Sequence, residues 1–355
     1  MVTAAVLAAA CFLWLLWSGM IPNGRTDRET GFSGPVSINM AVSQLNAAYK
    51  DRLADLQDGD YHEIQFQGQG PDWHSILAVF ACKISQGSEA SEAMELSSLN
   101  EDQAGLLEQV FWDMVLLSPR LERIEGENYS EESLFLSAGT RSPEEMASVY
   151  NFTGAQKKAL SALLAHPEIT DRWLCDLTSQ TPEAAALLSA LPGDLSPERR
   201  AVVEVACSLV GKVNYFWGGK SRVLGWDSRW GGVRKVTASG SVSSGLYRPY
   251  GLDCSGFVDW VFFNASAGQY LISQGGGARA QHKACQDISW EDALPGDLAF
   301  YPEDEHIGIV GGWDSQGNPL IIHCTSGANN VVITTASDFP VLARPLYFSG
   351  ALPVS

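Results

Sequence analysis

The sequence has few positive charges, no closely paired cysteines and no internal repeat. It holds 23 Lys and Arg against 41 Asp and Glu, a formal net charge of −18. This balance argues against nucleic-acid binding and against electrostatic attraction to anionic polymers. The seven cysteines are odd in number and scattered, with no Cys-x-x-Cys, and they fit neither a disulfide framework nor a metal site. We therefore expect no metal and no cofactor.

The N-terminal segment has no charge over residues 2–22 and is rich in Ala, Leu and Trp. About 20 apolar residues can span a bilayer, so residues 1–22 are interpreted as a transmembrane anchor or an uncleaved signal. A cleaved signal peptide is the alternative, but the usual basic segment and cleavage site are absent. Arg25 and Arg28 follow the run and, by the positive-inside rule, weakly favour a cytoplasmic location for that side, a bias that large domains override.

The remaining chain is long enough for two domains, and its hydrophobic content of 45% indicates globular structure. Residues 23–36 are polar and are interpreted as a linker. Residues 37–165 carry apolar residues at helical spacing and predict a mostly helical accessory domain without a recognisable chemical motif. Residues 166–195 are interpreted as a connection, and residues 196–350 as a second domain, which carries the motifs described next.

The stretch Gly251–Trp260 is the most informative part of the sequence. Cys254 lies between Asp253 and Ser255, which can cap a helix, and an amphipathic helical run follows. The unpaired N–H groups and the dipole at a helix N-terminus favour an anion, so a thiolate at this position is stabilised. The thiolate attacks carbonyls, which makes Cys254 a candidate nucleophile rather than a small buried hydrophobe.

Three short apolar runs downstream, bounded by turn residues, predict strands. His306 opens the second run and His323 lies near the end of the third. If these strands are antiparallel neighbours, the histidines are adjacent and the order nucleophile, base and orienting group is complete. Strand alternation places His323 and Cys324 on opposite faces, so only one of them faces the site.

Five sequence motifs, among them those of Cys254, His306 and His323, follow one another along the chain. Their residues and their order resemble those of the NlpC-type cell-wall cysteine endopeptidases, a papain-like family. The similarity covers about residues 196–348. It implies an α+β fold class, with a papain-like catalytic domain of helices packed on an antiparallel sheet, preceded by the mostly helical domain and the N-terminal transmembrane helix. The matching features are Tyr215–Gly219, Asp253–Gly256, Pro295–Leu298, His306–Ile309 and His323.

The resemblance also implies a role for each site residue. Cys254 is the nucleophile, His306 keeps it as thiolate and shuttles the proton, and His323 orients the imidazole. The Tyr215 hydroxyl helps to stabilise the oxyanion. Asp253 and Ser255, besides capping the helix, line the pocket that receives the free amine of a short peptide. The implied site is therefore catalytic Cys254, His306, His323 and Tyr215, with substrate-binding Asp253, Ser255 and Trp217.

The implied reaction is hydrolysis of peptidoglycan stem peptides between γ-D-glutamate and the following diamino acid. An amidase that cuts the muramoyl–peptide bond with the same Cys-His pair is one alternative. A non-catalytic wall-binding component of a secretion or conjugation machine is another. Because the wall lies outside the cell, we expect a single-pass membrane protein with its catalytic domain on the extracytoplasmic, cell-wall side. The expected partners are stem peptides, the membrane through the N-terminal helix, and conjugation or secretion machinery, without nucleic acid.

One departure from the family is a 33-residue insert, Lys220 to Leu252, between the tyrosine motif and the nucleophile. Its aromatic residues and glycines suit a lid beside the site. A tolerated surface insertion is the alternative, since long loops cost little entropy. Asp297 is interpreted as a structural turn residue. The remaining histidines, which lack partners at recognisable spacing, are treated as ordinary residues: His62, His74, His166 and His282.

Overall fold

The computed structural model describes residues 35–85, 98–125, 130–273 and 275–349, all of which belong to one compact unit that begins at Pro35. The predicted anchor at residues 1–22, and all but the end of the predicted linker, lie outside the described residues. Within the described ranges, no helix has the length and apolar character needed to cross a membrane. The domain boundaries predicted inside the unit stay predictions.

The region before residue 166 contains the expected helices, and local capping explains where they begin. Ser142 accepts a hydrogen bond from the N–H of Glu145 and precedes Pro143 at the first helical position, as its sequence predicted. Thr153 forms a reciprocal capping box with Gln156. The helices are α2 (Ile38–Gln57), α3 (Trp73–Ile84), α5 (Glu101–Met114), α6 (Pro143–Val149) and α7 (Gly154–Ala165).

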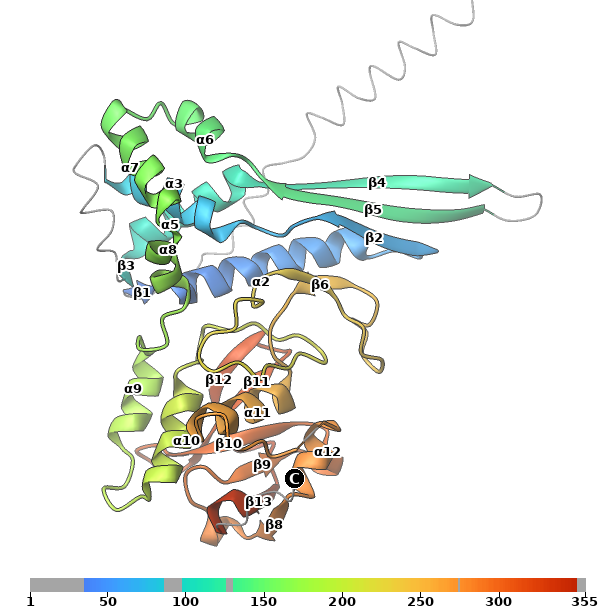
Figure 1. Ribbon diagram of the computed structural model, residues 1–355. Coiled ribbons are helices and arrows are strands. Elements are labelled where there is room, and N and C mark those ends of the chain that lie inside the picture. Colours follow the sequence, from blue (N-terminus) through green and yellow to red (C-terminus); the bar gives the residue numbers. More distant parts are fainter. Residues whose placement is uncertain (1–34, 86–97, 126–129, 274, 350–355) are drawn as a thin grey trace, which may run out of the picture. The chain divides into compact units, whose positions relative to one another are not determined.

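The same region also holds a sheet, so the prediction of a mostly helical domain at 37–165 is incomplete. Strand β5 pairs in parallel with β2 and antiparallel with β4 (Figure 1). The described residues of β2 and β4 are exposed or half-buried, whereas Leu134 and Leu136 of β5 are buried. Pro119 is tolerated because β4 is an edge strand. The strands are β2 (Glu63–Gly68), β4 (Val115–Glu125) and β5 (Ser130–Thr140), with the short pair β1 (Val36–Ser37) and β3 (Ser98–Leu99).

The later region is built on an antiparallel sheet whose described strands have the order β12-β11-β10-β9-β13-β8. Ile309 pairs with Ile322 and Val310 with Ile321, which confirms that the two histidine-bearing strands are antiparallel neighbours. The strands are β8 (Cys285–Ile288), β9 (Leu298–Phe300), β10 (Ile307–Trp313), β11 (Pro319–Thr325), β12 (Asn330–Thr335) and β13 (Val341–Pro345).

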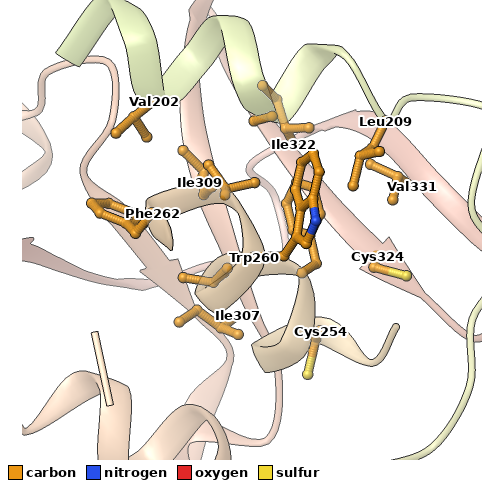
Figure 2. Packing of buried hydrophobic residues seen from close by; sticks show 14 of the residues in the cluster. Val202, Leu209, Cys254, Trp260, Phe262, Ile307, Ile309, Ile322, Cys324 and Val331 are labelled. Carbon is orange, nitrogen blue, oxygen red and sulfur yellow. The ribbon is translucent and has the colours of Figure 1, made fainter. Parts of the chain in front are cut away.

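Helix α11 packs on β10 and β11, and α10 packs on α11, which gives the expected arrangement of helices on an antiparallel sheet (Figure 1). Figure 2 shows Trp260 of α11 beside Ile322 of β11 and Leu209, which follows α10, with Val202 of α10 in the same cluster; Trp260 and Ile322 are 1% or less exposed. The helices here are α8 (Pro167–Leu174), α9 (Pro182–Ser189), α10 (Pro197–Cys207), α11 (Cys254–Ala265) and α12 (Gly277–His282), with 3-10 turns η1 (Trp290–Asp292), η2 (Pro302–Asp304) and η3 (Leu346–Ser349).

The insert 220–252 is packed against the rest of the fold. It forms a two-stranded ribbon of β6 (Val233–Lys235) and β7 (Tyr247–Pro249). Trp230 is buried and packs against Trp260 of the core. The Gln57 side chain, at the end of α2, accepts a hydrogen bond from the Tyr247 N–H at 2.7 Å and donates to the Tyr247 carbonyl at 3.0 Å. These contacts join the ribbon to both the core and α2, and the interpretation of the insert as a lid stays a prediction.

Candidate active site

The helix start predicted at Cys254 is confirmed. Asp253 is the N-cap of α11, and its Oδ1 accepts the Gly256 N–H at 2.6 Å and the Ser255 hydroxyl at 2.9 Å. Cys254 is the first helical residue and is a free thiol, 7% exposed. Figure 2 shows it in the first turn of α11, beside the apolar cluster. The cap therefore fixes the sulfur where the first N–H groups of the helix gather.

Three glycines hold the backbone close to the nucleophile. A Cβ at Gly256 would lie 2.0 Å from the Gly219 carbonyl oxygen, and a Cβ at Gly219 would lie 2.2 Å from that of Gly251. A Cβ at Gly251 would in turn lie 1.8 Å from the carbonyl oxygen of Asn214. Each obstacle is a backbone atom, which cannot rotate away as a side chain would. The tyrosine motif and the nucleophile motif are thus packed backbone to backbone.

The structure brings the two predicted histidines together. His306 Nε2 lies 2.7 Å from His323 Nδ1, and His323 Nε2 lies 3.0 Å from the Thr334 hydroxyl of β12. If Thr334 accepts from His323 Nε2–H, then His323 Nδ1 accepts from His306 Nε2–H, and His306 Nδ1 keeps a free lone pair. This tautomer is the one that a base needs. Sequence reasoning missed Thr334, since it is apparent only from the β11–β12 register.

The thiol lies within reach of both the helix start and strand β10. Burial, followed by the Asp253 charge, raises the pKa of Cys254 to about 12. The Lys220 ammonium and the backbone N–H groups of Ile307 and Ser255 act in the opposite direction. Burial therefore outweighs the helix N-terminus, and the expectation of a resting thiolate is not met. Because Ile307 directly follows His306, its contact with the sulfur also brings the histidine strand to the nucleophile.

Both histidines are neutral in this environment. Burial lowers the pKa of His306 to about 4, against a smaller upward effect of the Asp253 charge. Burial and then the neighbouring His306 lower the pKa of His323 to about 3. At neutral pH His306, which directly precedes the residue whose N–H reaches the sulfur, is thus an uncharged imidazole that can accept a proton.

The other predicted site residues take different positions. Burial, followed by the charges of Cys254 and Asp253, raises the pKa of the Tyr215 hydroxyl, which therefore lies within electrostatic reach of the thiol. Trp217 instead turns to the insert, where its Nε1–H donates to the Ser239 carbonyl at 2.9 Å. Cys324 is fully buried and donates to the Leu252 carbonyl, on the opposite face from His323 as alternation predicted.

Sequence reasoning missed Lys220, the first residue of the insert. Its Nζ lies 2.8 Å from Asp253 Oδ1 and also donates to the Ser255 hydroxyl. The two residues expected to receive the free amine of a peptide are therefore already bound to an ammonium of the chain itself. The contact joins residues 33 positions apart across the insert, and no spacing rule predicts such a pair.

Two buried carboxylates flank this site and have different partners. Burial raises the pKa of Asp259, on α11, to about 6. Asp297, just before β9, is fully buried and is paired with both Arg199 and Arg344, which fits its interpretation as structural.

His282, treated as ordinary, binds two carboxylates and stacks on Phe300. In the described part of the chain, no group of three or more His, Cys, Asp and Glu side chains can hold a metal ion.

Comparison with known proteins agrees with this geometry. Residues 212–339 match the model of the NlpC/P60 family, which confirms the resemblance drawn from the motifs. No curated protein matches the chain. Among solved structures, the peptidoglycan hydrolase RipB from Mycobacterium tuberculosis is 22% identical, over 56% of this chain and 88% of that chain, with a TM-score of 0.31. The NlpC/p60 domain of the peptidoglycan hydrolase SagA is 23% identical, over 41% and 97%, with a TM-score of 0.28.

Proposed function

We propose that the NlpC/P60 domain at residues 212–339 is a cysteine peptidase that cuts peptidoglycan stem peptides. The observation that carries the proposal is the position of Cys254 at the N-terminus of α11, next to the strand that begins after His306. The bond cut is the one between γ-D-glutamate and the following diamino acid. The family supports the substrate, and the geometry supports the chemistry.

The first half of the reaction acylates the enzyme. His306 Nδ1 accepts the Cys254 proton as the sulfur attacks the amide carbonyl. Because burial favours the neutral form of both groups, this proton moves during the attack rather than before it. The oxyanion is stabilised by N–H groups at the start of α11 and by the Tyr215 hydroxyl, at roughly 3–4 kcal/mol per donor. The imidazolium then gives its proton to the leaving amine, which leaves a thioester.

The second half releases the product. His306 accepts a proton from a water molecule, the resulting hydroxide attacks the thioester, and the thiolate leaves and is protonated by His306. His323 keeps the imidazole in the tautomer that leaves Nδ1 free, through its contacts with His306 Nε2 and Thr334. In these steps only Cys254 and His306 change protonation, and only Cys254 makes a covalent bond; the oxyanion donors and His323 act through hydrogen bonds.

The test is digestion of purified peptidoglycan followed by mass spectrometry. Release of fragments cut after γ-D-glutamate supports the proposal, whereas intact stem peptides freed from muramic acid indicate the amidase. Cys254→Ala should abolish product release without a change in melting temperature, because alanine fits the space of the thiol. Undiminished release by this variant contradicts the nucleophile assignment, and no release by the wild type favours a wall-binding component.

The role of His306 has its own test. His306→Ala should slow alkylation of Cys254 near neutral pH, because the thiol loses the base that takes its proton. Iodoacetamide labelling followed by peptide mass spectrometry measures this rate. Equal rates in the variant and the wild type would show that His306 is not the partner of Cys254.

The proposal includes the location of the enzyme. Residues 1–22 hold the protein in the membrane, and the catalytic domain acts on the cell-wall side, where conjugation or secretion machinery is a candidate partner. The support is the uncharged run at residues 2–22. Fractionation with N-terminal sequencing is the test, and a soluble protein whose mature N-terminus lies beyond residue 22 contradicts it.

A further inference from the structure

The anionic side of the site is already occupied by a cation of the chain. The Lys220 ammonium lies 2.8 Å from Asp253 Oδ1 and donates to the Ser255 hydroxyl. The same Asp253 oxygen, Oδ1, also accepts from the Gly256 N–H and the Ser255 hydroxyl, so this oxygen is fully used and an amine could approach Asp253 only beside the Lys220 ammonium. The Lys220 side chain is 38% exposed, so it lies at the edge of the site rather than in the core.

Lys220 is held in place by the insert and by the motif itself. Its N–H donates to the Tyr250 hydroxyl at 3.2 Å, and its carbonyl accepts from that hydroxyl at 2.7 Å and from Arg229 at 3.2 Å. A Cβ at Gly256 would lie 3.1 Å from Lys220 Cδ, so the glycine lets the lysine stem pass over the helix start. The ammonium is therefore positioned before any substrate binds.

This arrangement sets the charge that a substrate meets. A second ammonium at Asp253 would lie next to Lys220 and be repelled by it, since like charges at contact distance oppose binding. An ammonium has three donors, and Asp253 and Ser255 use two of them. Among the described residues, the third donor remains for an acceptor on the substrate. A carbonyl oxygen fits this position and an amine does not.

We propose that Lys220 is a specificity-determining residue that makes the site select peptides whose terminal amine is acylated. The substrate class is the stem peptide that is still amide-linked to the glycan strand, rather than the short free peptide. The inference rests on the proposed function, because it names the substrate class of the same site. It also assigns the insert a role, since Tyr250 and Arg229 hold the Lys220 backbone.

The experiment compares the stem tetrapeptide L-alanyl-γ-D-glutamyl-L-lysyl-D-alanine with its N-acetylated form. The wild type should show the higher kcat/KM for the acetylated peptide. Lys220→Met should shift the ratio towards the free peptide by about tenfold, because the repelling charge is gone and Asp253 becomes available. Lys220→Gln, which keeps a donor for Asp253 without the charge, serves as a second variant if Lys220→Met does not fold. Lys235→Met, the same change at an exposed position of the insert, should leave the ratio as it is.

Binding separates this inference from the proposed function. Calorimetry with Cys254→Ala protein should show the same preference for the acetylated peptide, and the added Lys220→Met change should remove it. A preference in binding without any cleavage by the wild type supports the role of Lys220 and refutes the peptidase proposal. A wild-type preference for the free peptide, an unchanged ratio in both folded Lys220 variants, or no binding of either peptide overturns the inference.

Discussion

Two aspartates of the catalytic region have basic partners but different surroundings. Asp297 has no exposed side-chain surface, and its carboxylate binds Arg199 at 2.9 Å, Arg344 at 2.9 and 3.1 Å, and the Leu294 N–H at 2.9 Å. Asp253 is bound by Lys220, whose side chain is 38% exposed. The first carboxylate joins α10, the turn before β9 and strand β13. The second lies beside the candidate nucleophile.

The difference shows how one type of contact serves two purposes. Both oxygens of the Asp297 carboxylate accept two hydrogen bonds each, and this carboxylate holds both guanidinium groups in place. These charged groups are therefore not available to bind another molecule. At Asp253 the cation is the ammonium of a flexible, partly exposed side chain, and one of its N–H donors remains for a substrate. This ion pair therefore contributes little to the free energy of unfolding but can act in substrate recognition. Replacing each carboxylate by its amide tests this comparison directly.

Asp297→Asn should have the largest effect on stability. The change leaves Arg199, which is 7% exposed, and Arg344 without a counter-charge, and breaking a buried pair costs about 3–5 kcal/mol. Urea unfolding followed by fluorescence measures the loss in the free energy of unfolding. A loss below about 1 kcal/mol, the range of exposed ion pairs, would contradict the contrast drawn here.

Asp259→Asn should stabilise the protein, by on the order of 2 kcal/mol above pH 6. The folded-state pKa of Asp259, about 6, is above its ordinary value of 3.8, because burial opposes the charged form. The folded state therefore binds more protons between these values, and the wild type loses stability as the pH rises from about 4 to 6. The variant should gain nothing below pH 4, where the carboxyl is neutral in both states. Thermal unfolding at pH 3.5 and 7.5 measures this, and an equal gain at both pH values would contradict it.

Asp253→Asn should change reactivity more than stability. Asparagine caps a helix about as well as aspartate, so the free energy of unfolding should change by less than about 1 kcal/mol. The Asp253 charge raises the pKa of Cys254, and its removal should increase the thiolate fraction and speed alkylation by roughly threefold to tenfold near neutral pH. The rate of iodoacetamide labelling measures this. Slower labelling would show that Asp253 acts on the thiol mainly through the helix cap.

Thr334→Val should have the smallest effect. The hydroxyl fixes the tautomer of His323 from an exposed position, where water can replace part of its function. We expect kcat to fall by about tenfold or less while KM stays unchanged, since the residue acts through His323 and His306 rather than on the substrate. Thr335→Val, one residue along the same strand, is the matched control. A change in KM alone would contradict a positioning role.

The catalytic elements were predictable because each has a local signature. Residues next to one another in the sequence predict the cap at Asp253, the alternation around His323 and the turn at Gly296–Asp297. The antiparallel pairing of β10 and β11 follows from the short connection between them. The sheet β2-β5-β4 was missed because the described residues of β2 and β4 are exposed or half-buried and show no clear apolar period, and the apolar run of β5 is only Leu134 to Leu136.

The contacts of Lys220 and Thr334 were missed for another reason. The Lys220–Asp253 contact joins the two ends of the insert, and the His323–Thr334 contact depends on the register between β11 and β12. Neither can be predicted from neighbouring residues. The resting state of the thiol was also mispredicted, because the favourable helix N-terminus is a local feature, whereas burial is set by the whole fold. Sequence patterns thus locate the candidate nucleophile and its candidate base, but not the charges around them.

The three glycines behind the nucleophile limit how this protein can evolve. At Gly219, Gly251 and Gly256 the obstacle to a side chain is a backbone carbonyl, and two of these carbonyls belong to another glycine of the set. A mutation at one position cannot be rescued by shrinking a neighbour, because the neighbour has no side chain to lose. Genetic drift should therefore leave these positions unchanged while the exposed tip of the insert around Val242, which is 98% exposed, varies freely. Directed evolution of new peptide specificity should therefore find its viable variants at Lys220 and not in the backbone contact that supports the thiol.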